Sequence, residues 1–166
     1  MPIMIVILIL AIALDQLTKL WARMTLVPGV EHLVIPQVLS WELAFNTGAA
    51  FSVFSGHTFW LMLVSAFVTV ILLIHSWRIQ AQAGTLYMAC LAFLIAGAGG
   101  NLIDRVIFQR VTDFINLLIL PGNFPIFNVA DICINIAVAL FLVDSSLNSK
   151  LNQRKFEDSE ILHKEA

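Results

Sequence analysis

Asp113 and Asp131 are the residues of this sequence whose chemistry most needs an explanation. They lie near the two ends of residues 111–131, VTDFINLLILPGNFPIFNVAD, a mostly apolar stretch interrupted by a Pro-Gly pair. An ionised carboxylate is costly in such surroundings and usually marks a functional site. If the chain brings the two acids together, they share one proton, because like charges in contact cannot both ionise.

Such a pair is suited to the hydrolysis of an amide bond. The ionised acid accepts a proton from the attacking water, while the protonated acid polarises the carbonyl and later passes a proton toward the leaving nitrogen. Neighbouring Asn and Arg side chains would hold the substrate in register. The sequence has no GxSxG or HExxH motif and no cluster of His and Cys at metal-ligand spacing. We therefore expect no metal and no other cofactor.

The composition indicates an integral membrane protein. Of the 166 residues, 60% are hydrophobic and only 12% are charged, whereas a soluble domain has about twice that charged fraction. The net charge of -2 excludes a basic surface for nucleic acid. Cys90 and Cys133 lie inside apolar runs, which predicts buried free thiols rather than a disulfide.

Four apolar segments are long enough to cross a hydrocarbon core of about 30 Å as helices. We expect one domain over residues 1–144, followed by a polar, frayed tail over 145–166; the spans are 3–24, 58–77, 85–106 and 127–143. A cleaved signal peptide is the rival interpretation of the first span. No Lys or Arg precedes that apolar run and no small-x-small site follows it, which favours a helix that is retained.

Residues 27–56 have a different pattern. Pro28, Gly29 and Pro36 break the helix, and residues 39–46 alternate apolar with small or polar side chains, which is the period of a half-buried strand. This segment predicts a small sheet on the membrane surface. The turn at Arg78 and the tail together hold five basic residues, so the positive-inside rule predicts that both termini are cytoplasmic. The sheet and the Asp113 loop would then share the outer face, where Arg23 and Arg110 would be plain loop charges.

Three of the predicted helices carry a polar stripe, and we expect these stripes to face one another because lipid offers no hydrogen-bond partners. Asp15 and Lys19 are four residues apart, which predicts an ion pair. Asp104 beside Arg105 can form a salt bridge at a helix end, while Asn128 and Asn135 can be hydrogen-bonding residues between helices. The other two stripes hold Gly97, Asn101 and Asp104 or Arg105, and Asn128, Asp131 and Asn135.

Five blocks of the sequence resemble the bacterial lipoprotein signal peptidase family (signal peptidase II, or prolipoprotein signal peptidase). They are residues 15–19 (DQLTK), 46–52 (NTGAAFS), 97–105 (GAGGNLIDR), 111–115 (VTDFI) and 127–131 (FNVAD). The blocks occur in the family's order and extend over nearly all of the membrane portion. Phe124 departs from the family, which more usually has a tryptophan there, and the tail matches nothing in it.

The resemblance implies an all-α membrane protein, a four-transmembrane-helix bundle with a small periplasmic β-sheet and a periplasmic loop over the active site. It implies that Asp113 and Asp131 are the catalytic dyad. The residues implied to bind substrate are Asn46, Gly97, Asn101, Arg105 and Asn128, and those implied to support the site are Asp15, Lys19 and Asp104. Residues 114–124 would form a lid lying on the membrane interface.

The implied activity is that of an intramembrane aspartyl endopeptidase of the bacterial inner (cytoplasmic) membrane. It would remove the signal peptide from diacylglyceryl-modified prolipoproteins by cleaving just before the lipidated lipobox cysteine, at a site near the periplasmic face. Membrane lipids and inhibitors such as the cyclic peptide globomycin would be further partners, and we expect a monomer. Two other functions fit the polar stripes: a small transporter or proton-coupled channel, although no internal repeat is visible, and a non-enzymatic scaffold.

Overall fold

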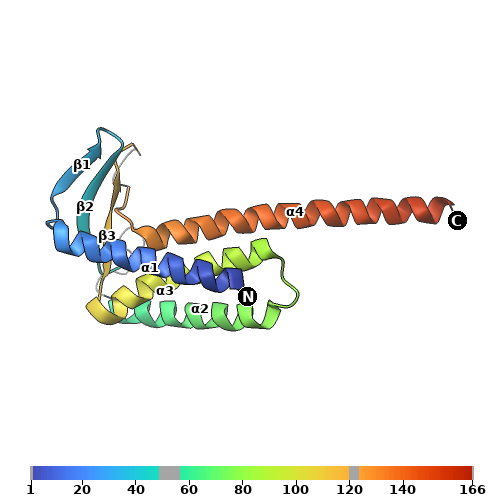
Figure 1. Ribbon diagram of the computed structural model, residues 1–166, viewed down its shortest axis with the longest axis horizontal. Coiled ribbons are helices and arrows are strands. Elements are labelled where there is room, and N and C mark those ends of the chain that lie inside the picture. The colour runs from blue at the N-terminus through green and yellow to red at the C-terminus, as the bar shows by residue number, and fades with distance from the viewer. Residues whose placement is uncertain (1, 49–56, 120–123, 166) are drawn as a thin grey trace.

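The computed structural model describes residues 2–48, 57–119 and 124–165, and it describes no side chain beyond Leu151 except that of Gln153. The described residues form four helices and three strands, and the strands lie together at one end of the helices (Figure 1). Their order is α1 (Pro2–Thr25), β1 (Glu31–Ile35), β2 (Leu39–Asn46), α2 (Thr58–Ile79), α3 (Thr85–Phe108), β3 (Val111–Leu117) and α4 (Val129–Glu165).

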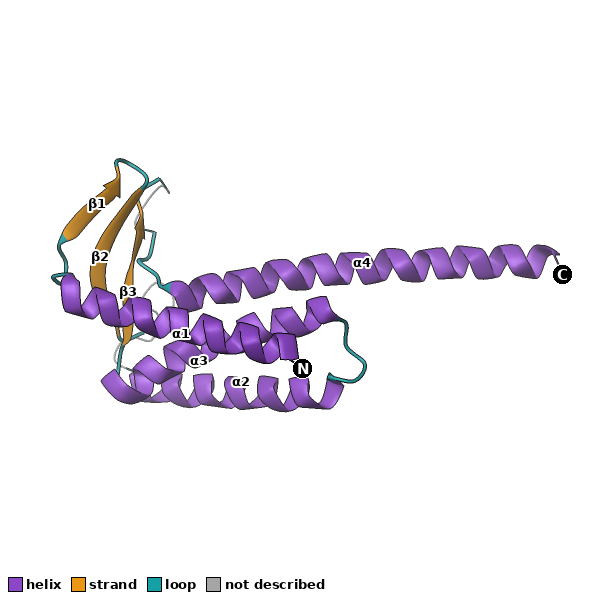
Figure 2. Cartoon of the chain, in the orientation of Figure 1, coloured by secondary structure: helices purple, strands orange, loops and turns teal. Residues whose placement is uncertain are grey.

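All four helices are long and apolar enough to cross a membrane, α4 over Val129–Leu151. This arrangement confirms the predicted fold class of four membrane-spanning helices with a small sheet. The sheet lies where α1 and α3 end and where α4 begins (Figure 2). The side of the membrane that it occupies stays a prediction.

Helix α3 is the centre of the bundle, because α1, α2 and α4 all pack against it. Small residues on α3 permit this close packing. A Cβ added to Gly97 would lie 2.5 Å from the backbone oxygen of Ala130, so only glycine fits between α3 and α4 there. The first turn of α4, which carries Asp131, is thereby held against the middle of α3.

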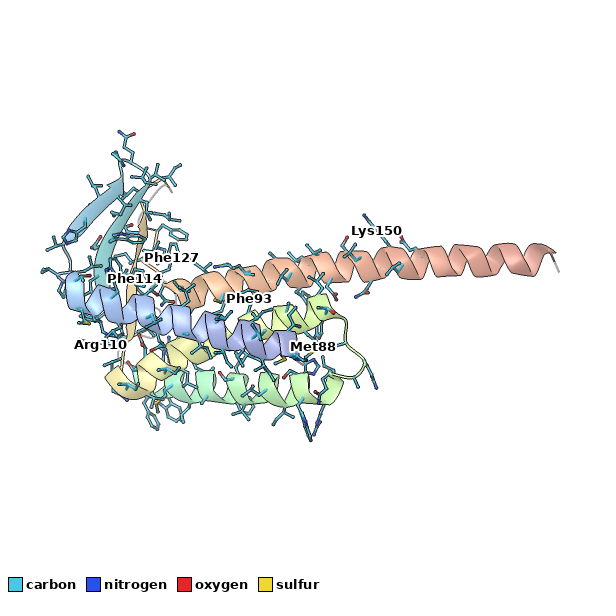
Figure 3. The ribbon with its side chains drawn as sticks, in the orientation of Figure 1. Met88, Phe93, Arg110, Phe114, Phe127 and Lys150 are labelled. Carbon is cyan, nitrogen blue, oxygen red and sulfur yellow. The ribbon has the colours of Figure 1, made fainter. Side chains whose placement is uncertain are left out.

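The three strands form an antiparallel sheet in the order β1-β2-β3. Strand β2 pairs with β3 so that Ala44 is opposite Asp113, and a register irregularity lies between Trp41 and Ala44. The apolar face of the sheet packs on the end of α1, where Leu43, Phe114 and Ile115 form a buried cluster with Ala22. Phe114 and Phe127 lie where the sheet meets the helices (Figure 3).

Two predictions about this region are wrong. Asp113 lies in a strand rather than in a loop, because residues 111–117 satisfy their backbone groups by pairing with β2. Phe114 and Ile115 belong to the same strand and are buried, so they are not part of a lid. Residues 120–123 of the predicted lid lie outside the described residues.

The predicted frayed tail is also wrong. Helix α4 continues as one helix to Glu165, well past the ends of the other helices (Figure 1). No Gly or Pro occurs after Pro125, and the polar residues that follow Asp144 include many good helix formers. The change from apolar to polar composition therefore marks the end of the predicted span and not the end of the helix.

The contact at Gly97 gives a test of the packing of α3 on α4. We expect Gly97→Ala to lower the free energy of unfolding by about 1–3 kcal/mol, because the added methyl group must displace backbone. Gly99→Ala is the matched control, since its Cβ would meet only the Ile12 side chain at 3.9 Å. That variant should be neutral or more stable. Equal effects of the two substitutions on unfolding in detergent would contradict the packing described here.

Candidate active site

Helix α4 begins with a reciprocal pair of hydrogen bonds between Asn128 and Asp131. The backbone N–H of Asp131 donates to Asn128 Oδ1, and the backbone N–H of Asn128 donates to Asp131 Oδ2, both at 3.1 Å. This is a capping box, which satisfies backbone donors at the start of a helix. The cap also fixes the direction of the Asp131 carboxylate, so the start of α4 is part of the site.

Asn128 joins the two aspartates. Its Nδ2 donates to Asp113 Oδ1 at 2.6 Å, while its backbone donates to Asp131 as described above. The remaining oxygens have separate donors. Asn46 Nδ2 reaches Asp113 Oδ2 at 3.2 Å, and Asn101 Nδ2 reaches Asp131 Oδ1 at 2.9 Å. Three asparagines from three different segments thus hold the two carboxyl groups in place.

A buried charge cluster lies behind these asparagines. The ion pair predicted between Asp15 and Lys19 is confirmed at 2.9 Å, and both side chains are almost fully buried. Lys19 Nζ also lies 3.8 Å from Asp104 and donates to Asn101 Oδ1 at 2.9 Å. Asp15 Oδ1 accepts a hydrogen bond from the backbone N–H of Ala130 in the first turn of α4. The cluster therefore connects α1 directly to the helix that carries Asp131.

Asp104 has different partners from those predicted. Its carboxylate accepts a hydrogen bond from the backbone N–H of Thr112 at 2.8 Å and lies 3.6 Å from Arg23. Arg105 instead donates to the backbone oxygen of Gly48 at 3.2 Å. The predicted salt bridge between Asp104 and Arg105 is wrong, because adjacent residues on a helix point in different directions.

A cavity of about 590 Å³ contains the two aspartates. Besides the two aspartates, its polar lining residues are Asn46, Asn101, Arg105 and Asn135, and the other lining residues are apolar. The cavity is lined by Asn46, Asn101, Arg105, Val111, Asp113, Leu117, Phe124, Pro125, Ile126, Phe127, Asp131, Ile134 and Asn135. Phe124, which stands in place of the more usual tryptophan, packs edge-on against Phe127 in this wall.

Burial, followed by the nearby Asp131 charge, raises the pKa of Asp113 from its ordinary range to about 6. The hydrogen bonds from Asn128 and Asn46 act in the opposite direction, because they stabilise the ionised form. Asp113 therefore takes up a proton far more readily than an exposed aspartate does. A carboxyl group of this kind is suited to donating a hydrogen bond to a substrate carbonyl.

The structure brings together all of the predicted site residues except one. Asn46, Asn101, Arg105 and both aspartates line the cavity, while Asn128 is fully buried and acts through its hydrogen bonds. Gly97 lies at the contact of α3 with α4, which gives it a packing role. Its predicted contact with substrate stays a prediction.

Sequence reasoning missed two residues of the site and misjudged Arg110. Arg23, expected to be a plain loop charge, lies in α1 and donates to Thr112 Oγ1 at 2.8 Å besides facing Asp104. The signal was present, since Arg23 continues the four-residue spacing of Asp15 and Lys19. Thr112 gave no such signal. Arg110, also expected to be a loop charge, lies over the Phe45 ring at 3.6 Å.

The predicted free thiols at Cys90 and Cys133 are confirmed, and both are buried. Within the described ranges, no three side chains of His, Cys, Asp or Glu are grouped so that they could hold a metal ion. The polar side chains that line the site carry carboxyl, amide and guanidinium groups.

Fold and site together define a polytopic membrane protein with an acidic site at one end of its helical bundle. The family model for "Signal peptidase (SPase) II" matches residues 7–147. A "Lipoprotein signal peptidase" of Synechococcus sp. (strain RCC307) is 43% identical over 132 residues, 80% of this chain and 86% of the relative. That of Listeria welshimeri is 41% identical over 132 residues, 80% of this chain and 85% of the relative.

A solved bacterial membrane enzyme, determined by the in meso method at 2.3 Å resolution, has a similar structure. It superposes with a TM-score of 0.82 and 31% identity over 90% of each chain. The chain belongs to the signal peptidase II family, and it is a peptidase. The resemblance seen in the sequence is thereby confirmed.

The buried charge cluster gives a second test. Asp15→Ala leaves the Lys19 ammonium without its nearest counter-ion and Ala130 N–H without an acceptor. We expect the free energy of unfolding to fall by about 3–5 kcal/mol, which is typical when one member of a buried ion pair is removed. Glu31→Ala, which removes an exposed acid from β1, is the control and should have little effect. An Asp15→Ala protein with normal melting and no activity would mean that Asp15 acts in the chemistry.

Proposed function

We propose that this peptidase is an aspartyl endopeptidase, which cleaves diacylglyceryl-modified prolipoproteins just before the lipidated cysteine. Membership of the signal peptidase II family supports the general activity, which is the removal of signal peptides from prolipoproteins. The aspartyl mechanism rests on one observation above all. Asp113 and Asp131 line the same cavity and are both hydrogen-bonded to Asn128.

In the proposed reaction the shared proton resides on Asp113, whose pKa is raised to about 6. Asp131 is then the base that accepts a proton from water as the water attacks the scissile carbonyl. Protonated Asp113 donates a hydrogen bond to that carbonyl, where negative charge develops. A proton then passes from the pair to the leaving nitrogen. Asn46, Asn101 and Asn128 need not move, because they already hold the carboxyl groups.

The cavity supports a substrate that is part peptide and part lipid. Arg105 and Asn46 both line the cavity and both bond with the backbone of Gly48, so they present neighbouring polar groups to a peptide backbone. Leu117, Ile126 and Ile134 form apolar walls suited to acyl chains. The helix end at Asn128 and the apolar face of the sheet both suggest a site close to the membrane surface.

We place the protein in the inner membrane, with both termini cytoplasmic and the site near the periplasmic face. Basic residues are in excess at the end of the bundle away from the sheet, in the Arg78 turn and along α4 beyond Asp144, and the positive-inside rule supports a cytoplasmic position for that end. Globomycin-type peptides would inhibit by occupying the same cavity. A single chain contains every group that the proposed reaction uses, which supports a monomer.

The dyad is tested by replacing each acid in turn. We expect Asp113→Asn and Asp131→Asn to remain folded, because an amide of the same size fits each site, and to lose cleavage of a diacylglyceryl-modified precursor by at least about a thousandfold. Asp144→Asn changes an acid at the opposite end of the bundle and should retain full activity. Full cleavage by either purified dyad variant would remove the basis of the proposal.

The pH dependence of cleavage tests the role of Asp113. Since the reaction needs this group protonated, kcat/KM should fall above about pH 6, by about tenfold per pH unit at the limit. Asn46 stabilises the ionised form of Asp113 by its hydrogen bond. Asn46→Leu should therefore raise the pKa and move the fall in activity to higher pH.

Asn116→Leu is the matched control for this experiment. Asn116 also lies in the sheet, but its amide donates to Glu42 Oε2 rather than to the dyad. The control should keep the wild-type pH profile. A profile that moves to lower pH in Asn46→Leu, or that moves equally in both variants, would show that protonated Asp113 is not the required form.

A further inference from the structure

Asn135 lies on α4 one turn beyond Asp131, about 6 Å further along the helix axis. Its side chain is exposed and lines the same cavity as the two aspartates. The surrounding residues 132–143, ICINIAVALFLV, contain no other side chain with a nitrogen or an oxygen. A single amide thus stands in the apolar part of the helix, at the edge of the site.

Helix packing does not account for this amide. Asn135 Nδ2 donates to the backbone oxygen of Asp131 in its own helix at 3.0 Å, and among the described residues no other element bonds with its side chain. Asn128, by contrast, does bond with Asn101 of α3. The interpretation of Asn135 as a hydrogen-bonding residue between helices is therefore wrong. One amide N–H and the amide oxygen stay available to a ligand.

The surroundings of Asn135 indicate what that ligand contains. An amide that faces hydrocarbon without partners is costly, because lipid chains offer no hydrogen bonds. The same cavity is also lined by Ile134, the preceding residue of α4, and by the apolar side chains of Phe124 and Ile126. The ligand group at this point must therefore be an uncharged acceptor or donor attached to an apolar chain.

The proposed substrate carries such a group. In a diacylglyceryl-modified cysteine, two ester groups stand a few bonds from the sulfur, at the points where the acyl chains begin. With the scissile bond at the dyad, an ester group a few bonds from the sulfur would be within reach of Asn135, which lines the same cavity one helical turn from Asp131. An ester carbonyl accepts a hydrogen bond but carries no charge, which matches the single free N–H of Asn135.

We propose that Asn135 is a specificity-determining residue that donates a hydrogen bond to an ester carbonyl of the diacylglyceryl group. This inference rests on the proposed function. It adds that the enzyme recognises the ester linkage itself, in addition to the apolar chains. A glyceryl group with ether-linked chains has the same shape and length but lacks the carbonyl oxygen, so it provides the discriminating substrate.

The test uses the purified full-length protein in detergent and two synthetic precursor peptides that differ only in ester or ether linkage of the glyceryl chains. We expect the wild type to show a kcat/KM about threefold to tenfold higher for the ester substrate, which is the usual effect of one hydrogen bond. Asn135→Leu should bring this ratio close to one by raising KM for the ester substrate alone. Asn135→Ala should do the same, which separates lost hydrogen bonding from crowding by leucine.

Ile136→Leu is the matched control, because Ile136 is the exposed neighbour on α4 and does not line the cavity. It should keep the wild-type ratio. A wild-type ratio of one, or a ratio unchanged in both Asn135 variants, would overturn the inference while leaving the peptidase proposal intact. If the wild type cleaves neither substrate, both this inference and the proposed peptidase function are overturned.

Discussion

Charge buried among apolar helices is the constraint on which this structure depends. The side chains of Lys19, Asp15 and Asp104 are almost completely buried, and the lipid of a membrane offers none of them a replacement hydrogen-bond partner. Their partners come from different elements. Asp15 accepts a hydrogen bond from a backbone N–H of α4, and Asp104 accepts one from a backbone N–H of β3. Lys19 donates a hydrogen bond to Asn101 of α3. Satisfying these groups requires the helices and the sheet to meet in one arrangement, which is the arrangement that forms the site.

The cluster also determines how the dyad is held. A Lys ammonium can only donate hydrogen bonds, so the Asn101 oxygen must face Lys19 and its nitrogen must face Asp131. The same reasoning fixes Asn128, whose amide nitrogen lies between the Asn101 oxygen and Asp113. A buried positive charge far too enclosed to touch substrate thus fixes the orientation of the amides that contact both acids. These buried polar residues form one connected network, and the two aspartates are among its members that line the cavity.

Much of this arrangement could be predicted from the sequence, and the parts that could not share a physical reason. Long apolar runs predict spanning helices without reference to anything else, and the four-residue spacing of Asp15 and Lys19 predicts their ion pair. Strand β3 could not be predicted in this way, because its identity depends on pairing with β2, more than sixty residues earlier. The contact of Asp104 with Arg23 was missed for the same reason, since Arg23 is distant in sequence. Thr112 is only eight residues from Asp104, but its N–H reaches the carboxylate because the chain turns from α3 into β3. The exposure of Asn135 likewise follows from which face of α4 the bundle leaves uncovered. From the residues alone, a catalytic Asp113–Asp131 pair is only one of several interpretations, and the resemblance to a family is what favours it.

The central claim is that Asp113 and Asp131 share one proton, which resides on Asp113. Three asparagines hold the two carboxyl groups by hydrogen bonds. Infrared difference spectroscopy of the detergent-solubilised protein observes that proton without recourse to activity. As the pH is raised from 5 to 8, the carbonyl stretch of a protonated carboxyl group should disappear with a midpoint near 6, the value to which the pKa of Asp113 is raised, and this band should be missing from Asp113→Asn. If the wild type shows no such band in that range, or if the band persists unchanged in Asp113→Asn, the shared proton is not where this account places it.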